Sequence, residues 1–270
     1  SVDVNRQIRS GFPALNTQVF VGQVSGKTSL LHPSDPVHSI WSSNGNNLSP
    51  LNLFKPDANA QTVTVPVVVT APNANAHVGG NSSAPLCSAA FSSGYPVVIF
   101  QHGITSNRGT ELALAGALTN VCAVGIAIDL PEHGILPTDA QFGFLAKTSA
   151  NGGVSPVGPT GERLVAHGAG VPSLSNPAGG VSGTSVDVTG SGDYRCAAGD
   201  SYINLFNLMN SRDVLRQSVI DLDSLYLALS NASNVGMPTI DTSKVSFVGM
   251  SLGSIVGETF VATLGNIGGS

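Results

Sequence analysis

The sequence predicts an α/β fold with a doubly wound, mostly parallel β-sheet. From residue 96 onward, apolar runs of strand length alternate with segments that have helical periodicity. The alternation is interrupted once, at 134–200, by a stretch rich in Gly, Ser, Thr, Val and Pro. A serine between two glycines then follows the last apolar run, where a strand is expected to turn sharply into a helix.

The N-terminal part of the chain has a different character. Residues 1–58 are rich in Asn, Ser and Pro, with at most short strands such as Gln18–Val21. We interpret 1–58 as an N-terminal extension packed on the domain formed by 59–270. Gln61–Thr70 alternates β-branched residues and predicts a strand, and Pro66 favours an edge position because proline lacks the N–H that a ladder needs.

Two continuous apolar runs, Pro96–Gln101 and Val124–Asp129, predict buried parallel strands, with a helix over 110–121 between them. The stretch 134–200 then follows a strand end, at the face where ligands bind in such sheets. A loop of this length is either functional or disordered. We interpret it as a lid or a substrate-pocket insertion, and a surface excursion without a role is the alternative.

A long helix is predicted to begin near Asn210, where Asn210, Ser211 and Asp213 supply capping side chains. Its apolar residues recur at helical spacing and predict a face that packs on the core. They are Leu215, Val219, Leu222, Tyr226 and Leu229.

The apolar run Val245–Val248 leads into Gly249-Met250-Ser251-Leu252-Gly253. This is the G-x-S-x-G nucleophile elbow of α/β-hydrolases, in its strand–turn–helix context. The turn is so tight that side chains at Gly249 and Gly253 would collide with the neighbouring strand and helix. The sequence therefore predicts Ser251 as a catalytic nucleophile.

An oxyanion formed by attack of Ser251 needs N–H donors placed where the charge develops. The N–H of Leu252, directly after the nucleophile, is one predicted donor. The second is expected from the loop after the strand 96–101, where Gly103 allows a close turn. We select the Ile104 N–H, with Gly103 as the alternative, and expect His102 to hold the loop by hydrogen bonds.

The catalytic base and acid are harder to place. In α/β-hydrolases both follow the nucleophile, yet the 19 residues after Ser251 contain no Asp and no His. Glu258 lies two turns down the same helix and points toward the helix body. We therefore expect a fold that is incomplete at the C-terminus, with the triad Asp or Glu and His supplied by a second polypeptide segment or chain. Recruitment of an upstream histidine is the alternative, although a structural role is favoured for His133.

Composition excludes several other functions. Charged residues make up 10% of the chain, the net charge is −5, and no Lys/Arg cluster exists, so nucleic acid is not an expected partner. No apolar run is long enough for a membrane span. Cys87, Cys122 and Cys196 have no metal-ligand spacing, and no cofactor or metal is expected. Both one disulfide with a leftover thiol and three free thiols stay open.

Four segments occur in an order that resembles the extracellular bacterial lipases of the virulence-factor lipase family, over about residues 60–265. They are Pro96–Asn107, Ile128–Gly134, Asn210–Gln217 and Phe247–Gly253. The resemblance implies an α/β-hydrolase fold, a signal peptide removed on export, and lipid or carboxylic-ester substrates. It also implies that Ser251 is the nucleophile and that Ile104 and Leu252 form the oxyanion hole. Met250 and Ser254 replace the His and Gly of many relatives.

The predicted function is that of a secreted or cell-surface serine carboxylic-ester hydrolase, a lipase or esterase that acts on lipid or small esters through an acyl-enzyme on Ser251. The elbow does not define the leaving group, so a thioesterase, peptidase or polyester depolymerase is an alternative. A non-catalytic binding module that retains the elbow is another. Reaction with a fluorophosphonate would distinguish the last from the others, because it needs an activated serine.

Overall fold

The computed structural model describes residues 2–8, 15–29, 61–135, 139–146, 163, 165–166, 186–187, 194–196, 199, 202–205, 207–234 and 237–264. The domain boundary predicted at residue 58 and most of the insertion 134–200 lie outside these residues. The same is true of the chain after Leu264.

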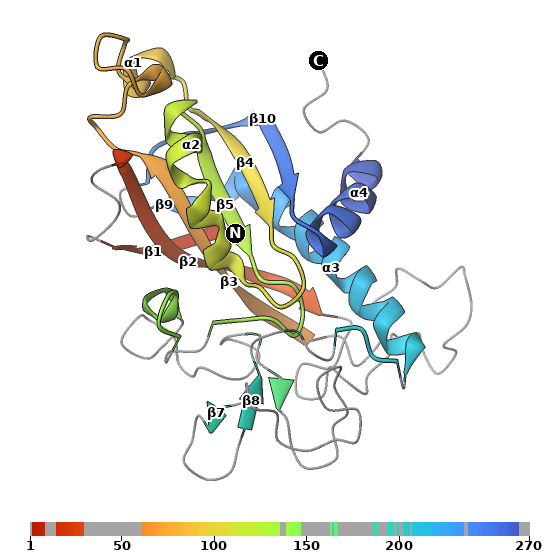
Figure 1. The fold of residues 1–270 in the computed structure, drawn as a ribbon. Coiled ribbons are helices and arrows are strands. Elements are labelled where there is room, and N and C mark those ends of the chain that lie inside the picture. The colour runs from red at the N-terminus through yellow and green to blue at the C-terminus, as the bar shows by residue number, and fades with distance from the viewer. Residues whose placement is uncertain are drawn as a thin grey trace.

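A mixed sheet of seven strands organises the described part of the chain (Figure 1). The strands lie in the order β10-β4-β5-β3-β2-β1-β9. Their bounds are β1 (Val2–Ile8), β2 (Thr17–Ser29), β3 (Gln61–Pro72), β4 (Tyr95–Gln101), β5 (Val124–Ile128), β9 (Ser233–Asn234) and β10 (Ile240–Gly249). β10, β4 and β5 are parallel to one another, whereas β3, β2 and β1 each run antiparallel to the preceding strand in this order.

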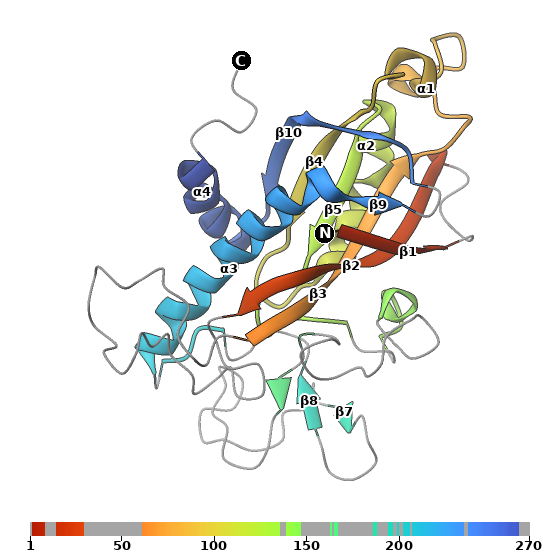
Figure 2. The same cartoon turned by 180° about the vertical axis from the view of Figure 1, so that it is seen from behind.

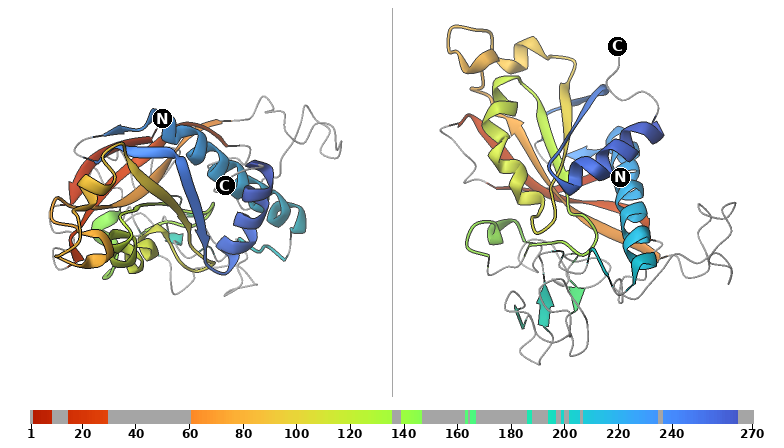
Figure 3. Two further views of the ribbon diagram at one scale, coloured as in Figure 1. Left: turned by 90° about the horizontal axis from the view of Figure 1, so that it is seen from above. Right: turned by 45° about the vertical axis from the view of Figure 1, so that its right-hand side comes forward.

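Helices cover both faces of the sheet. The α-helices are α1 (Cys87–Ala90), α2 (Ala115–Asn120), α3 (Leu208–Ala228) and α4 (Leu252–Leu264). Short 3-10 segments are η3 (Val78–Gly80), η4 (Arg108–Ala113), η5 (Gly143–Leu145) and η7 (Leu229–Asn231). α2 lies on one face, and α3 and α4 lie on the other, as Figures 1 and 2 show from opposite sides. α3 and α4 pack against each other (Figure 3). The predicted α/β, doubly wound fold class is confirmed.

The parallel strands β4 and β5 form the centre of the core, whereas β10, at the edge of the sheet, has only one buried residue, Val245. Every residue of β5 is buried, and β4 has only two partly exposed positions. Burial on both faces explains why these strands are continuously apolar rather than alternating. The sequence pattern therefore located them correctly, and their carboxyl ends carry the loops described below.

The antiparallel strands differ from the prediction. β2 has 13 residues, where only a short strand at 18–21 was expected, and it pairs along β3. Two strands from the segment 1–58 thus lie inside the main sheet. The edge position expected from Pro66 is wrong, because β3 lies between β2 and β5. The pairing of β3 with β5 spans only 67–70, so β5 does not pair with the strand at Pro66.

The helices also depart from the pattern in detail. The segment predicted as one helix over 110–121 is the 3-10 turn η4 followed by α2. In α3 the buried face includes Gln217, Ser218 and Asp221, and Leu215 is 36% exposed. The buried face of α3 is therefore rotated from the predicted apolar face. Polar side chains, which a count of apolar spacing leaves out, also pack against the core.

The described pieces of the insertion lie beyond the carboxyl ends of β4 and β5 (Figures 1 and 2). They include a small antiparallel sheet of β6 (Val165–Ala166), β8 (Tyr194–Cys196) and β7 (Val186–Asp187), in that order. Its proposed role as a lid or pocket remains a prediction. At the opposite end of the sheet, a disulfide joins Cys87 and Cys122, which rules out the arrangement with three free thiols.

Candidate active site

The chain turns from β10 into α4 at Met250 and Ser251. Ser251 has a φ of 52°, in the left-handed region that non-glycine residues rarely occupy, and it is exposed. The Met250 N–H donates to the Gln101 carbonyl at 3.0 Å, and the Gly253 N–H donates to the Met250 carbonyl at 2.9 Å. These bonds tie the turn to β4 and to α4. The predicted strand–turn–helix geometry is present, with Ser251 at its apex.

Both glycines of the motif occupy positions without room for a side chain. A Cβ on Gly249 would lie 2.7 Å from the backbone of Gly253 and of Ser254, inside the helix. A Cβ on Gly253 would collide with the carbonyl oxygens of Gln101 and His102, on the neighbouring strand. The collisions predicted from the sequence are confirmed, and the glycines allow β4, β10 and α4 to meet at one point.

Strand register brings the loop after β4 against the elbow. In the parallel pair, Gly249 is in register with Gln101, so Ser251 and Gly103 each lie two residues beyond the paired positions. A Cβ on Gly103 would lie 3.0 Å from the Ser251 Cβ and 3.6 Å from its Oγ. The absence of a side chain at Gly103 therefore leaves the loop backbone in contact with the serine.

The two predicted N–H donors lie on the segments that flank this contact. Leu252 is the first residue of α4 and is buried, and the N–H groups of a first helical turn have no acceptor within the helix. Ile104 follows Gly103 and packs, half-buried, on the main core. Leu252 is thus adjacent to Ser251 in the chain, and Ile104 is adjacent to Gly103, which lies beside Ser251. Their role in stabilising an oxyanion stays a prediction.

His102 is fully buried and holds this loop with both ring nitrogens. Nδ1 lies 2.7 Å from the Gly103 carbonyl, and Nε2 lies 3.1 Å from the Leu130 nitrogen. A carbonyl only accepts and a backbone N–H only donates, so this pair of contacts requires the neutral tautomer protonated at Nδ1. Burial lowers the pKa of His102 below its ordinary value, by more than the Asp129 carboxylate raises it. The geometry matches the loop-holding role expected from the sequence.

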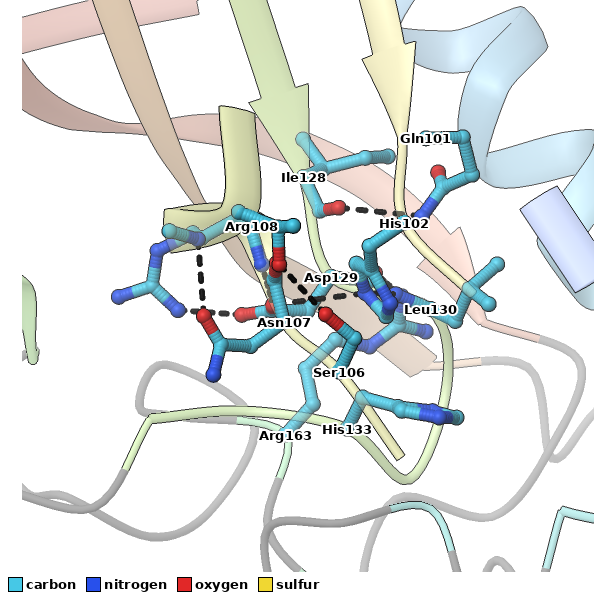
Figure 4. A network of polar contacts seen from close by, with 12 residues as sticks. Gln101, His102, Ser106, Asn107, Arg108, Ile128, Asp129, Leu130, His133 and Arg163 are labelled. Atoms are coloured by element: carbon cyan, nitrogen blue, oxygen red, sulfur yellow. Dashed lines mark hydrogen bonds and ion pairs between the residues drawn. The ribbon is translucent and has the colours of Figure 1, made fainter. Parts of the chain in front are cut away.

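A buried ion pair supports the other end of the loop (Figure 4). The Asp129 carboxylate accepts from the Arg108 backbone N–H at 2.7 Å and pairs with its guanidinium. The guanidinium also donates to the Leu145 carbonyl at 2.9 Å. Burial by itself raises the pKa of Asp129, but the Arg108 guanidinium and His102 outweigh it and hold the pKa below its usual value. Asp129 therefore fixes where η4 begins.

Residues just beyond β5 form a second buried polar group. Burial raises the pKa of Glu132 to about 8, and Arg163 opposes this shift. Both Glu132 carboxyl oxygens and the Nε2 of His133 are buried and have no hydrogen-bond partner among the described residues. The His133 ring lies 5.0 Å from that of His102 and 5.5 Å from that of Tyr202, and burial lowers its pKa to about 3. Burial therefore favours the neutral form of both Glu132 and His133.

The described histidines are bonded elsewhere. His77, His102 and His133 each have one ring nitrogen on a backbone carbonyl, of Ala84, Gly103 and Pro131 respectively. Within the described residues, no histidine forms a hydrogen bond with Ser251. The structural role favoured for His133 fits its buried position between His102 and Tyr202.

Sequence reasoning missed the supporting charges. Arg108, Asp129 and Arg163 were not singled out, although Asp129 ends an apolar strand, where a buried acidic residue stands out. Nothing in the sequence pattern identifies Arg163, which lies in the aperiodic stretch. Among the described residues, no cluster of His, Cys, Asp or Glu is arranged to hold a metal ion. None of the helices described is long and apolar enough to cross a membrane.

Comparison with known proteins gives only distant likenesses. No family model matches the chain, and no curated protein matches it. An acetyl xylan esterase from Paenibacillus sp. R4 is similar in structure, with a TM-score of 0.38 and 11% identity over 97% of this chain and 48% of that one. A ferulic acid esterase from Streptomyces cinnamoneus gives a TM-score of 0.37 and 13% identity over 97% and 58%. The chain thus spans about half the length of these proteins, and a likeness at this level defines neither family nor substrate.

Proposed function

We propose that the protein is a serine carboxylic-ester hydrolase, a lipase or esterase, with Ser251 as its nucleophile. The observation that carries the proposal is the contact between Gly103 and the exposed Ser251 at the apex of a tight strand–helix turn. An ester carbonyl attacked by Ser251 Oγ would lie between the elbow and the loop after β4. The N–H groups of Leu252 and Ile104 would then stabilise the negative charge on the carbonyl oxygen.

The reaction passes through an acyl-enzyme. Ser251 Oγ forms a bond to the carbonyl carbon, a general base takes its proton, and the alcohol leaves with a proton returned by that base. Water then attacks the acyl-enzyme in the same way and releases the acid. We propose that the base, a histidine, and its orienting acid are supplied from outside this chain. The bonding of His77, His102 and His133 to backbone carbonyls supports this proposal.

We also propose that the protein is secreted or exposed at the cell surface. The disulfide between Cys87 and Cys122 supports it, because such bonds persist mainly in oxidising compartments. Lipids or small carboxylic esters are the proposed substrates, since the elbow chemistry acts on acyl groups.

The test is Ser251→Ala in the full-length protein. Hydrolysis of short p-nitrophenyl esters should fall by roughly 10⁵-fold or more, because the nucleophile is lost. Ser254→Ala is the matched control, since Ser254 is exposed in the first turn of the same helix. Fluorophosphonate should label the wild type and Ser254→Ala but not Ser251→Ala. Equal hydrolysis by both variants would remove Ser251 from the mechanism, and an unlabelled, inactive wild type would indicate a binding module instead.

A further inference from the structure

Arg163 connects the insertion to two elements of the main fold. Its Nη1 donates to the Asp129 backbone carbonyl at 2.7 Å and forms an ion pair with Asp221, in the middle of α3. Arg163 is only 14% exposed, and Asp221 is 2% exposed. One guanidinium therefore joins the carboxyl end of β5 to α3 from within the stretch 134–200.

Asp129, which Arg163 contacts, and its neighbour Leu130 are hydrogen-bonded to both ends of the loop that faces Ser251. Through its side chain, Asp129 holds the Arg108 backbone N–H and guanidinium. The next residue along, Leu130, donates its N–H to His102, whose other ring nitrogen donates to the Gly103 carbonyl. Two paths therefore start at Asp129, whose carbonyl Arg163 holds (Figure 4). One runs through the Asp129 side chain to Arg108, and the other runs through Leu130 and His102 to Gly103, so they reach the two ends of the loop 102–107.

The charges of this buried region are arranged around the same contact. Two cations, Arg108 and Arg163, face two carboxylates, Asp129 and Asp221. Glu132 faces Arg163 as well, as a buried carboxyl. Loss of Arg163 therefore has two separable effects: it removes a cation from beside Asp221, and it removes the donor from the Asp129 carbonyl.

We infer that Arg163 is a positioning residue, which fixes the loop 102–107 opposite Ser251 through its bond to the Asp129 carbonyl. The inference rests on the proposed function for its kinetic consequence. When Asp129 is held, His102 and Arg108 fix the loop backbone at Gly103 and Ile104. When it is released, the donors shift relative to the carbonyl oxygen, which weakens stabilisation of the transition state more than binding of the substrate.

Four variants of the full-length protein separate the two effects. Arg163→Met removes the cation and the donor together, whereas Asp221→Asn leaves the bond to the Asp129 carbonyl in place. In Arg163→Met/Asp221→Asn, one cation and one carboxylate are removed, so the charge is balanced and only the donor is missing. Arg163→Lys keeps a cation with a single donor nitrogen, so it should lose less activity than Arg163→Met.

Arg163→Met and the double variant should both lose roughly 10- to 100-fold in kcat, with KM within about 2-fold of wild type. Asp221→Asn should lose much less. A double variant with wild-type kcat would overturn the inference, because charge balance would then explain the whole effect of Arg163. The double variant also keeps the test decisive where Arg163→Met alone fails to fold.

Amide hydrogen exchange tests the inference without reference to activity. Peptides covering 102–110 should exchange faster in the double variant, because opening of this loop becomes easier. Peptides from β3, at 61–72, should exchange as in wild type. Unchanged exchange at 102–110 would overturn the inference even if the protein is an esterase. Hydrolysis that survives Ser251→Ala would instead overturn the proposed function, and the exchange result would stand.

Discussion

Gly103 and Ser251 lie so close together that a Cβ on Gly103 would be 3.0 Å from the Ser251 Cβ and equally close to the Met250 carbonyl oxygen. Gly103→Ala should therefore displace the loop after β4 from the elbow by a few tenths of an ångström. A displacement of about 1 Å in a catalytic donor costs on the order of 10²-fold in rate, and this smaller shift costs less. We expect kcat/KM for p-nitrophenyl esters to fall by about 3- to 10-fold, with the midpoint of urea unfolding little changed.

Gly116→Ala is the control for this glycine substitution. A Cβ on Gly116 would lie 3.4 Å from the Leu15 side chain, which is an ordinary contact, and alanine is the better helix former within α2. Activity should stay at the wild-type level. Equal losses in the two variants would mean that Gly103 has no special relation to Ser251.

Gly253→Ala should act on stability rather than on catalysis alone. Its Cβ would lie 2.5 Å from the His102 carbonyl oxygen, and it would meet the Gln101 carbonyl as well. Both are backbone atoms that cannot rotate away, so α4 has to move from β4. Overpacking of this kind costs about 1–3 kcal/mol or more. Urea unfolding should show this loss for Gly253→Ala and almost none for Ser254→Ala, and equal stabilities would contradict the close packing.

The sequence predicted those parts of the fold whose pattern is local. The apolar runs of β4 and β5 and the glycines around Ser251 identify the parallel half of the sheet, because burial and tight turning constrain the residues themselves. The register of β10 on β4 then follows, and it brings Gly103 to Ser251. The half of the candidate site that lies on these two strand ends was therefore predictable.

The parts that escaped prediction depend on residues far apart in the chain. Arg108 and Asp129 are 21 residues apart, and Arg163 and Asp129 are 34 apart, so no spacing rule connects them. In α3, Asp221 is buried because Arg163 reaches it from the insertion. A periodicity count treats such a residue as surface, which is why the predicted face of α3 was rotated.

The disulfide between Cys87 and Cys122 closes a loop with a sequence separation of 35 residues. In the chain-entropy model, a cross-link over such a loop contributes about 4 kcal/mol by restricting the unfolded chain. The double variant Cys87→Ala/Cys122→Ala should lose most of this amount in urea unfolding. Dithiothreitol should lower the stability of the wild type and leave the variant unchanged. A wild type that does not respond to reduction under unfolding conditions would contradict the disulfide.

Stability should fall between pH 7 and 8 because of Glu132. Burial raises its pKa to about 8 from an ordinary value of 4.5, so the folded protein holds a proton that the unfolded chain has released. The free energy of unfolding therefore decreases with rising pH up to about 8, by at most about 1.4 kcal/mol per unit for one group. Glu132→Gln, which mimics the protonated carboxyl, should flatten this decrease. A slope unchanged from wild type would exclude Glu132 as its source.

Glu111 is a second buried carboxyl whose pKa is raised, and its titration must be separated from that of Glu132. It is fully buried in η4, where it accepts a hydrogen bond from Thr70, and burial raises its pKa to about 7. At pH 7 Glu111 is therefore about half ionised, but most of the stability that its proton provides has already been lost between its ordinary pKa and pH 7. Glu111→Gln should leave most of the decrease between pH 7 and 8 in place. Below pH 6.5 the buried His133, whose pKa is lowered to about 3, acts in the opposite sense, because the unfolded chain then binds the extra proton. Urea unfolding at pH 7, 7.5 and 8 therefore reports mainly on Glu132. A Glu111→Gln variant that loses this slope would instead make Glu111 its source.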